Sequence, residues 1–236
     1  VDGGWRISGG KHFISNGPVA SLYFLFAQTN SNEGVMLGST CFLIERDSPG
    51  FTIGRVHDKM GERLTTNAEL NFTDCFVPDE NVLGEVDRGH QARALFSLGS
   101  SVHAAALVLG VAATAYERAI EWTRDRVQGG KPIIEHQAVG LSLSRMKMLL
   151  TTAQVTLWHA AWGIDEDPDY RPCTTYWTKA FITQACREVA EQAMELMGGS
   201  GVMRETGMEK HVRDVLCMFH VDGGRDITLL KAVKYL

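Results

Sequence analysis

The stretch that decides the fold is FTDCFVPDENVLGEVDRGHQ at residues 72–91, followed by ARALFSLGSSVHAAALVLGVAATAYERAIE at residues 92–121. Before Gly84 the chain consists of short β-rich runs that Gly, Asn and Asp interrupt. After Gly84, long stretches with helical periodicity continue almost without breakers. The sequence therefore predicts a β domain at residues 1–84 and a helical domain at residues 85–236.

The same patterns predict the individual elements. We expect strands at residues 5–8, 12–15, 22–27, 41–45, 51–56 and 68–77. We expect helices at about residues 90–126, 135–164, 173–197, 205–219 and 226–235. The acidic, proline-containing segment at residues 165–172 predicts an antiparallel connection between two long helices. The expected fold class is α+β, mainly α, with a partial β-barrel or sheet followed by an up-down helical bundle.

Composition excludes several functional classes. The 236 residues are 44% hydrophobic and 22% charged, which is typical of a globular protein. A net charge of -5 with scattered basic residues argues against nucleic-acid binding. The five cysteines include no CxxC pair, so neither a disulfide framework nor a metal site is predicted, and a reducing compartment is expected, the cytoplasm or the mitochondrial matrix. We expect no membrane span, because no segment approaches about 18 uninterrupted apolar residues.

Glycine clusters are the remaining local signals. They occur at residues 129–130, 198–201 and 223–224, next to expected helix ends. Glycine lets the backbone approach a ligand closely, and exposed amides at a helix amino terminus favour anionic groups such as phosphate. For any one cluster, an ordinary helix cap or turn explains the glycines equally well.

The order of several longer motifs is more specific. KHFISNG at residues 11–17 is similar to the flavin-facing strand, K-x-[WF]-I-[TS]-N, of the acyl-CoA dehydrogenase family. RVQGGKPIIEHQ at residues 126–137 resembles R-x-Q-F-G-x-P-I-x-x-H-Q, and ELMGGSG at residues 195–201 resembles Q-x-x-G-G-x-G. Segments 60–63 and 72–84 resemble the end of the family's β domain. The family's amino-terminal helical domain has no counterpart in this sequence.

The resemblance implies FAD as the cofactor. Phe13 and Ser15 would flank the isoalloxazine ring, although a strand-core phenylalanine and a turn serine are the plainer alternatives. Arg126 would bind the pyrophosphate of an FAD in a neighbouring subunit through its planar guanidinium, and its alternative role is that of a cation in the last turn of a helix. The resemblance places the other cofactor contacts at Gln128, His136, Glu195, Gly198, Gly199, Gly224 and Asp226.

The resemblance also implies the chemistry: a carboxylate removes the α-proton of an acyl thioester while hydride leaves the β-carbon for flavin N5. The family places a glutamate eight residues after the Asp of an Arg-Asp pair, and counting from Asp214 leads to Asp222. This side chain is one methylene shorter, and small misplacements cost about a hundredfold in rate. The alternative is that Asp222 is only a cap or turn residue.

Further departures bear on the substrate. Val221 replaces an aromatic gate, which implies a roomier pocket, and Gly224 replaces a threonine. The resemblance places Gly223 and the helix residues Ser100 and Ser101 next to the substrate. We expect a branched, cyclic or otherwise unusual acyl-CoA, with electrons passed to an electron-transfer flavoprotein by a homo- or hetero-tetramer, a dimer of dimers. Two alternatives stay open: a non-catalytic subunit of a hetero-oligomer, and a flavin monooxygenase on the same fold.

Overall fold

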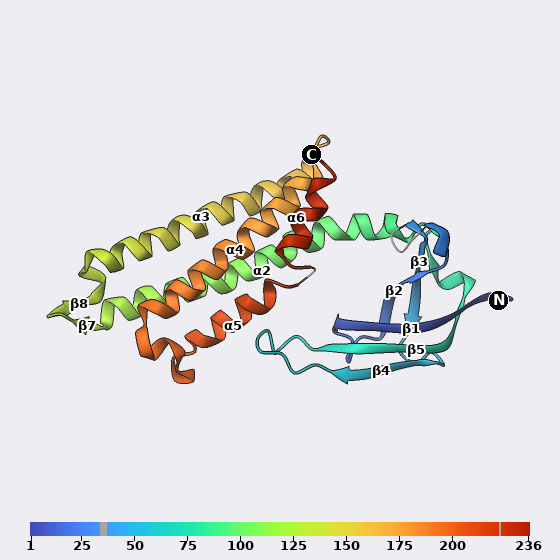
Figure 1. The fold of residues 1–236 in the computed structure, drawn as a ribbon, viewed down its shortest axis with the longest axis horizontal. Helices are drawn as coiled ribbons and strands as arrows, with labels where there is room; N and C mark the ends of the chain where they lie inside the picture. The colour runs from blue at the N-terminus through green and yellow to red at the C-terminus, as the bar shows by residue number, and fades with distance from the viewer. Residues whose placement is uncertain (34–36, 222) are drawn as a thin grey trace. The chain divides into compact units, whose positions relative to one another are not determined.

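The computed structural model describes residues 1–33, 37–221 and 223–236, apart from the side chain of Leu95. These residues form two compact units. Unit 1 contains Val1–Lys59 and Arg63–Ser97, and unit 2 contains Met60–Glu62 and Leu98–Leu236. Unit 1 holds the strands β1 to β6 and unit 2 most of the helical chain (Figure 1), which confirms the expected α+β class.

Unit 1 consists of two antiparallel three-stranded sheets, with orders β1-β5-β4 and β2-β3-β6. The strands are β1 (Gly4–Ser15), β2 (Leu22–Gln28), β3 (Ser39–Glu45), β4 (Phe51–Val56), β5 (Asn67–Pro78) and β6 (Val82–Leu83). Along β5, the buried residues Ala68, Leu70 and Phe72 alternate with polar residues, so one face of the sheet packs in the core and the other carries polar groups.

Strand β1 differs from its prediction. The two expected strands at residues 5–8 and 12–15 form one continuous strand through Gly9 and Gly10. The register against β5 shifts between Ile7 and Gly9, where Gly9 has a φ of 144°. The glycines therefore produce a bulge within the strand and not a turn between two strands.

Unit 1 extends into the first turns of a helix, to Ser97, beyond the Gly84 expected as the domain boundary. The backbone amide of Asp87 donates to Thr40 Oγ1 at 2.9 Å, and its carboxylate accepts from Thr29. Gly89 lies so close to β3 that an added Cβ would be 2.9 Å from the carbonyl oxygen of Ser39. These contacts fix the start of the helix to the sheet.

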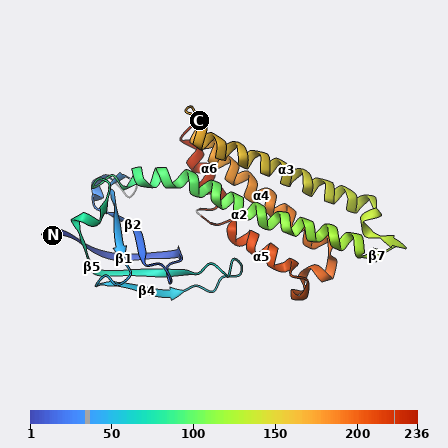
Figure 2. The ribbon, with the colours of Figure 1, turned by 180° about the vertical axis from the view of Figure 1, so that it is seen from behind.

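Unit 2 is a bundle of long helices (Figure 2). They are α2 (Gly89–Asp125, whose first turns belong to unit 1), α3 (Gln137–Glu166), α4 (Pro172–Leu196), α5 (Met208–Met218) and α6 (Arg225–Val233). Helix α4 contacts α3, α5 and α6. The shorter elements of unit 2 are the hairpin β7 (Val127–Gln128) and β8 (Lys131–Pro132) and the 3-10 helices η3 (Ile133–Glu135), η4 (Gly198–Val202) and η5 (Arg204–Thr206). The 3-10 helices η1 (Ser31–Glu33) and η2 (Asp79–Asn81) belong to unit 1.

The core of unit 2 uses the small-residue face of α2. Five residues at helical spacing are fully buried there: Ala105, Val108, Ala112, Ala115 and Ala119. By length and composition alone, α2 is long and apolar enough to cross a membrane, although it contains no run of 18 uninterrupted apolar residues. Core helices of globular bundles have the same length and composition, and the buried face of α2 belongs to the core of unit 2.

Candidate functional site

A cavity of 630 Å³ in unit 2 brings together five of the residues predicted to bind the cofactor. It is lined by residues from the end of α2, from β7, from the end of α4 and from η4. The predicted residues in its wall are Arg126, Gln128, Glu195, Gly198 and Gly199. These residues lie up to 73 positions apart in the chain, so their convergence is a property of the fold.

The hairpin after α2 places Arg126 and Gln128. The backbone amide of Arg126 still donates to the carbonyl of Trp122 at 2.9 Å, so this residue continues from the last turn of the helix. His136 Nε2 lies 2.9 Å from the carbonyl oxygen of Gln128. His136 is not among the residues that line the cavity, so its role in the described structure is to hold the hairpin.

The glycines of η4 have two different roles. Gly198 has a φ of 58°, and a Cβ added at Gly198 or Gly199 would meet no atom of the described chain within 4 Å. An added Cβ at Gly201, in contrast, would overlap the carbonyl oxygen of Met194. Gly201 is therefore required for packing, whereas Gly198 and Gly199 present open backbone to the cavity.

The groups in this cavity fit the pyrophosphate and adenosine part of FAD. The Arg126 guanidinium is exposed and can bind phosphate oxygens in a bidentate manner. The open backbone at Gly198 and Gly199 lets a flat ring lie close to the chain. The carboxylate of Glu195, where the family has glutamine, accepts from hydroxyl or amine donors but repels phosphate, so it suits the adenosine portion.

A second group of predicted residues lies in the turn between α5 and α6. Asp222, the predicted base, is outside the described residues. Its neighbours are held by Lys179 of α4, whose Nζ donates to the carbonyl oxygens of Val221 at 2.7 Å and Gly223 at 3.2 Å. The Lys179 side chain is buried, with 2% of the residue exposed. A buried ammonium thus fixes the backbone on both sides of Asp222.

Lys179 lies outside the motifs that predict functional residues. Its only signal in the sequence is a single cation inside the mostly apolar run YWTKAFI at residues 176–182 of a predicted helix. Lysine is almost never fully buried unless its ammonium is paired, so a lysine on a core-facing helical position points to a specific acceptor. The acceptors are backbone carbonyls more than 40 residues away, and no pattern in the sequence identifies them.

The remaining predicted residues of this region surround the turn or lie on α2. Gly224 and Asp226 line a separate cavity of 320 Å³ with Gln184 and Arg187. Asp226 pairs with the adjacent Arg225, with 3.1 Å between Oδ1 and Nε. Of the predicted substrate residues on α2, Ser101 is buried and Ser100 is half-buried.

The two groups of unit 2 lie at different levels of α4. Lys179 is in its first half and Glu195 near its end, 16 residues later, which corresponds to about 24 Å along the helix axis. The cavity at Arg126 and the backbone that Lys179 holds at Val221 and Gly223 are therefore separate places within unit 2.

Phe13 and Ser15 belong to unit 1. Phe13 is 72% exposed with a φ of 58°, and its ring stacks on His57 with centroids 4.9 Å apart. The alternative interpretation, that Phe13 is an ordinary strand-core residue, is wrong. Ser15 Oγ accepts a hydrogen bond from Asn67 Nδ2 at 3.1 Å and lines a cavity of 720 Å³ within unit 1.

The Arg213-Asp214 pair that locates Asp222 in the sequence has a structural role in unit 2. Asp214 is 6% exposed on α5, where Oδ1 accepts the backbone amide of Glu62 at 2.6 Å and Oδ2 pairs with Lys210. Burial alone would raise the pKa of Asp214, but the hydrogen bonds from Lys210 and Glu62 outweigh it and lower the pKa below the ordinary 3.8. The segment 60–62 is thereby tied to α5.

The lowered pKa of Asp214 predicts a pH-dependent contribution to stability. A carboxylate with a depressed folded pKa stabilises the fold above its unfolded pKa, and the contribution is lost as pH falls through the folded pKa. We expect Asp214→Asn to lower the free energy of unfolding by about 1–2 kcal/mol at pH 7. The difference in free energy of unfolding between Asp214→Asn and wild type should shrink below pH 3.8.

Urea unfolding at pH 7 and pH 3 measures this difference at both pH values. Asp165→Asn, in an exposed position, is the control, and an equal loss for Asp214→Asn at both pH values would contradict the prediction.

Models of known protein families match the chain over the segments that carry these motifs. Residues 96–234 match the family model for the acyl-CoA dehydrogenase C-terminal domain, and residues 1–75 match the model for its middle domain. The chain belongs to the acyl-CoA dehydrogenase family. The resemblance inferred from the motifs is thus confirmed, and the two family models together cover most of both units.

Individual relatives span a range of acyl substrates. The chain is 33% identical over 229 residues to a short-chain specific acyl-CoA dehydrogenase of Megasphaera elsdenii, covering 97% of this chain and 59% of that protein. It is 33% identical over 223 residues to a cyclohex-1-ene-1-carbonyl-CoA dehydrogenase of Syntrophus aciditrophicus, covering 94% of this chain and 53% of that protein. The chain therefore spans little more than half the length of these relatives.

Solved structures of the family share the fold. Butyryl-CoA dehydrogenase from Megasphaera elsdenii superposes with a TM-score of 0.95 at 32% identity, covering 99% of this chain and 61% of that one. A structure of PigA with FAD and proline superposes with a TM-score of 0.94 at 26% identity, covering 100% of this chain and 61% of that one. The expected sheet and helical bundle of the acyl-CoA dehydrogenase type are therefore confirmed.

Proposed function

We propose that the protein containing this chain is an FAD-dependent acyl-CoA dehydrogenase acting on a branched, cyclic or otherwise unusual acyl thioester. The observation that carries the proposal is the cavity formed by Arg126, Gln128, Glu195, Gly198 and Gly199, because it gathers motif residues of the family around open glycine backbone. Family membership supports the reaction class, and the relative named for a cyclic acyl-CoA supports the breadth of substrate.

In this proposal the residues of the chain have distinct tasks. Arg126 binds the FAD pyrophosphate, and Phe13 and Ser15 lie beside the isoalloxazine ring. When bound, FAD supplies the hydride acceptor. Asp222 removes the α-proton, and Lys179 positions it by holding the carbonyls of Val221 and Gly223. Val221, in place of an aromatic gate, leaves room for a wider acyl group next to Gly223, Ser100 and Ser101.

The proposal extends to oligomeric state, partner and compartment. Because Lys179, which holds Val221 and Gly223, and Glu195 of the Arg126 cavity lie about 24 Å apart along α4, FAD shared between two subunits would let each chain use both sites, as in a homo- or hetero-tetramer. The reduced flavin needs an acceptor, for which we propose an electron-transfer flavoprotein. The five free cysteines support a reducing compartment, the cytoplasm or the mitochondrial matrix.

The decisive experiment is an anaerobic absorbance spectrum of the full-length protein before and after addition of acyl-CoAs. The panel compares straight-chain, 2-methyl-branched and cyclic thioesters. We expect the oxidised flavin spectrum to bleach, and to bleach fastest with a branched or cyclic thioester. A flavin that only dithionite bleaches would overturn dehydrogenation in favour of the monooxygenase, and a protein that binds no FAD would favour the non-catalytic subunit.

A further inference from the structure

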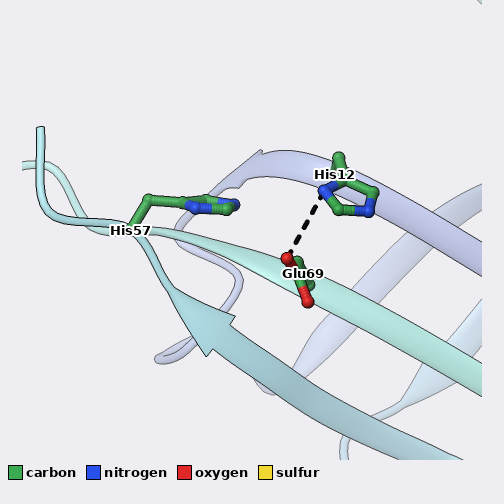
Figure 3. A group of neighbouring side chains, drawn as sticks. All are labelled: His12, His57 and Glu69. Atoms are coloured by element: carbon green, nitrogen blue, oxygen red, sulfur yellow. Dashed lines mark ion pairs between the residues drawn. The ribbon is translucent and has the colours of Figure 1, made fainter.

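Two histidines and a glutamate meet on the polar face of the β1-β5-β4 sheet, within unit 1. His12 belongs to β1, Glu69 to β5, and His57 directly follows β4 (Figure 3). One nitrogen of each imidazole and one carboxylate oxygen of Glu69 all lie within 4.8 Å of one another. Imidazole nitrogen and carboxylate oxygen are the ligand types of catalytic and surface zinc sites.

The backbone places these side chains through two bulges. Leu70 pairs with residue 11 of β1 and residue 53 of β4, whereas Ala68 pairs with residue 14 of β1 and residue 56 of β4. Glu69 therefore has an irregularity of register on both neighbouring strands. Bulges change the direction of a side chain, and they are frequent next to functional sites. Here they bring His12 and His57 toward the same carboxylate.

Gly54 leaves space for that carboxylate. A Cβ added at Gly54 would lie 3.1 Å from Glu69 Oε2, 3.0 Å from Glu69 Cβ and 2.7 Å from Asn71 Nδ2. Its φ does not lie in the left-handed region, so the requirement for glycine here is steric. The sequence thus keeps room for the Glu69 carboxylate on the face that carries both histidines.

The polar atoms of the group are not satisfied by one another. Among the described residues, no hydrogen-bond partner reaches the buried Nε2 of His57. His12 Nδ1 is 3.6 Å from Glu69 Oε1, too far for a hydrogen bond. A buried imidazole nitrogen without a partner carries a free-energy cost that a bound ligand would remove. The stacked ring of Phe13, 4.9 Å from that of His57, restricts the imidazole further.

We propose that His12, His57 and Glu69 bind one divalent transition-metal ion of the zinc class, with a fourth position for water. At metal-ligand distances of about 2.0–2.2 Å, tetrahedral ligand atoms lie about 3.4 Å apart. Separations of up to 4.8 Å must therefore contract by at most about 1.4 Å. The His12 side chain is 62% exposed and can adjust without disturbing the core, and it already lies 3.6 Å from Glu69 Oε1. The ion then ties all three strands of the sheet together.

The ligand set also predicts selectivity. Imidazole favours Zn²⁺, Cu²⁺ and Ni²⁺, whereas Mg²⁺ and Ca²⁺ require mostly oxygen ligands. A single carboxylate with two imidazoles should therefore bind Zn²⁺ far more tightly than Mg²⁺. Zinc binding is measured directly, so the test does not depend on turnover.

The test is calorimetric titration of the full-length, tag-free protein with ZnCl₂ after removal of metal by EDTA, together with thermal unfolding with and without ZnCl₂. We expect one equivalent of Zn²⁺ per chain and a higher Tm. His12→Gln and Glu69→Gln should each weaken Zn²⁺ binding about tenfold or more and reduce the Tm shift, since each removes one of three ligands. His159→Gln, on α3 and outside the group, is the matched control and should bind like wild type.

The exposed position of His12 keeps the test informative even if a His57 variant unfolds. Unchanged zinc affinity in both His12→Gln and Glu69→Gln would overturn the proposal and leave an ordinary histidine-carboxylate pair. Equal affinity for MgCl₂ and ZnCl₂ would also overturn it, because it would indicate simple attraction to the carboxylate. Loss of one zinc equivalent in these two variants, with retention in His159→Gln, would support it.

Discussion

Replacing Asp222 by asparagine is expected to slow the bleaching of the flavin by an acyl-CoA by about 10²–10⁴-fold, which is the usual contribution of a positioned general base. Asparagine has nearly the same shape but cannot accept the α-proton. Lys179 would still hold the carbonyls of Val221 and Gly223, so the turn should keep its backbone path. The measurement is single-turnover absorbance under anaerobic conditions, with the thioester at saturation.

Two further variants make the result specific to the carboxylate. Asp222→Glu should be much faster than Asp222→Asn, because it keeps the base and differs only by one methylene. Asp169→Asn, in the exposed turn between α3 and α4, should bleach at the wild-type rate. If Asp222→Asn bleached as fast as wild type, the base would be another group, or Asp222 would have only the role of a turn residue.

The sequence predicted the helices well because their signals are local. Apolar spacing, the proline at residue 172 and the glycines after helix ends determine boundaries within a few residues. The strands were predicted less fully: Gly9 and Gly10 signalled a break, but pairing with β5 carries the backbone through them as a bulge. Pairing depends on a partner more than 60 residues away, which local reasoning does not include.

The same difference between local and long-range signals applies to the candidate functional residues. Contiguous motifs predicted the residues of the Arg126 cavity, because each motif is a short continuous run of the sequence. His12, His57 and Glu69 were not predicted as a group, since only the register of three strands and two bulges brings them together. The absence of a CxxC pair predicts no metal site, and cysteine spacing carries no information on histidine or glutamate ligands.

Arg126→Ala is expected to weaken FAD binding about 10–100-fold while leaving the rate at saturating FAD nearly unchanged. Hydrogen bonds to a charged group contribute about 1.5–3 kcal/mol, and each 1.4 kcal/mol corresponds to tenfold in affinity. The guanidinium is exposed at the wall of the 630 Å³ cavity, so its loss should not disturb the core of unit 2. Fluorescence titration of the flavin-free protein with FAD measures the dissociation constant.

The variant Arg126→Lys distinguishes the effect of the positive charge on FAD binding from the effect of the planar guanidinium. Arg126→Lys keeps the positive charge but loses the planar fork, so its FAD affinity should fall between wild type and Arg126→Ala. Arg124→Ala removes an exposed cation from the last turn of the same helix without touching the wall of the cavity, and it should bind FAD like wild type. Equal weakening by Arg124→Ala and Arg126→Ala would mean that the helix end attracts FAD only through its net charge, and the cavity would then lose its assignment as the pyrophosphate site.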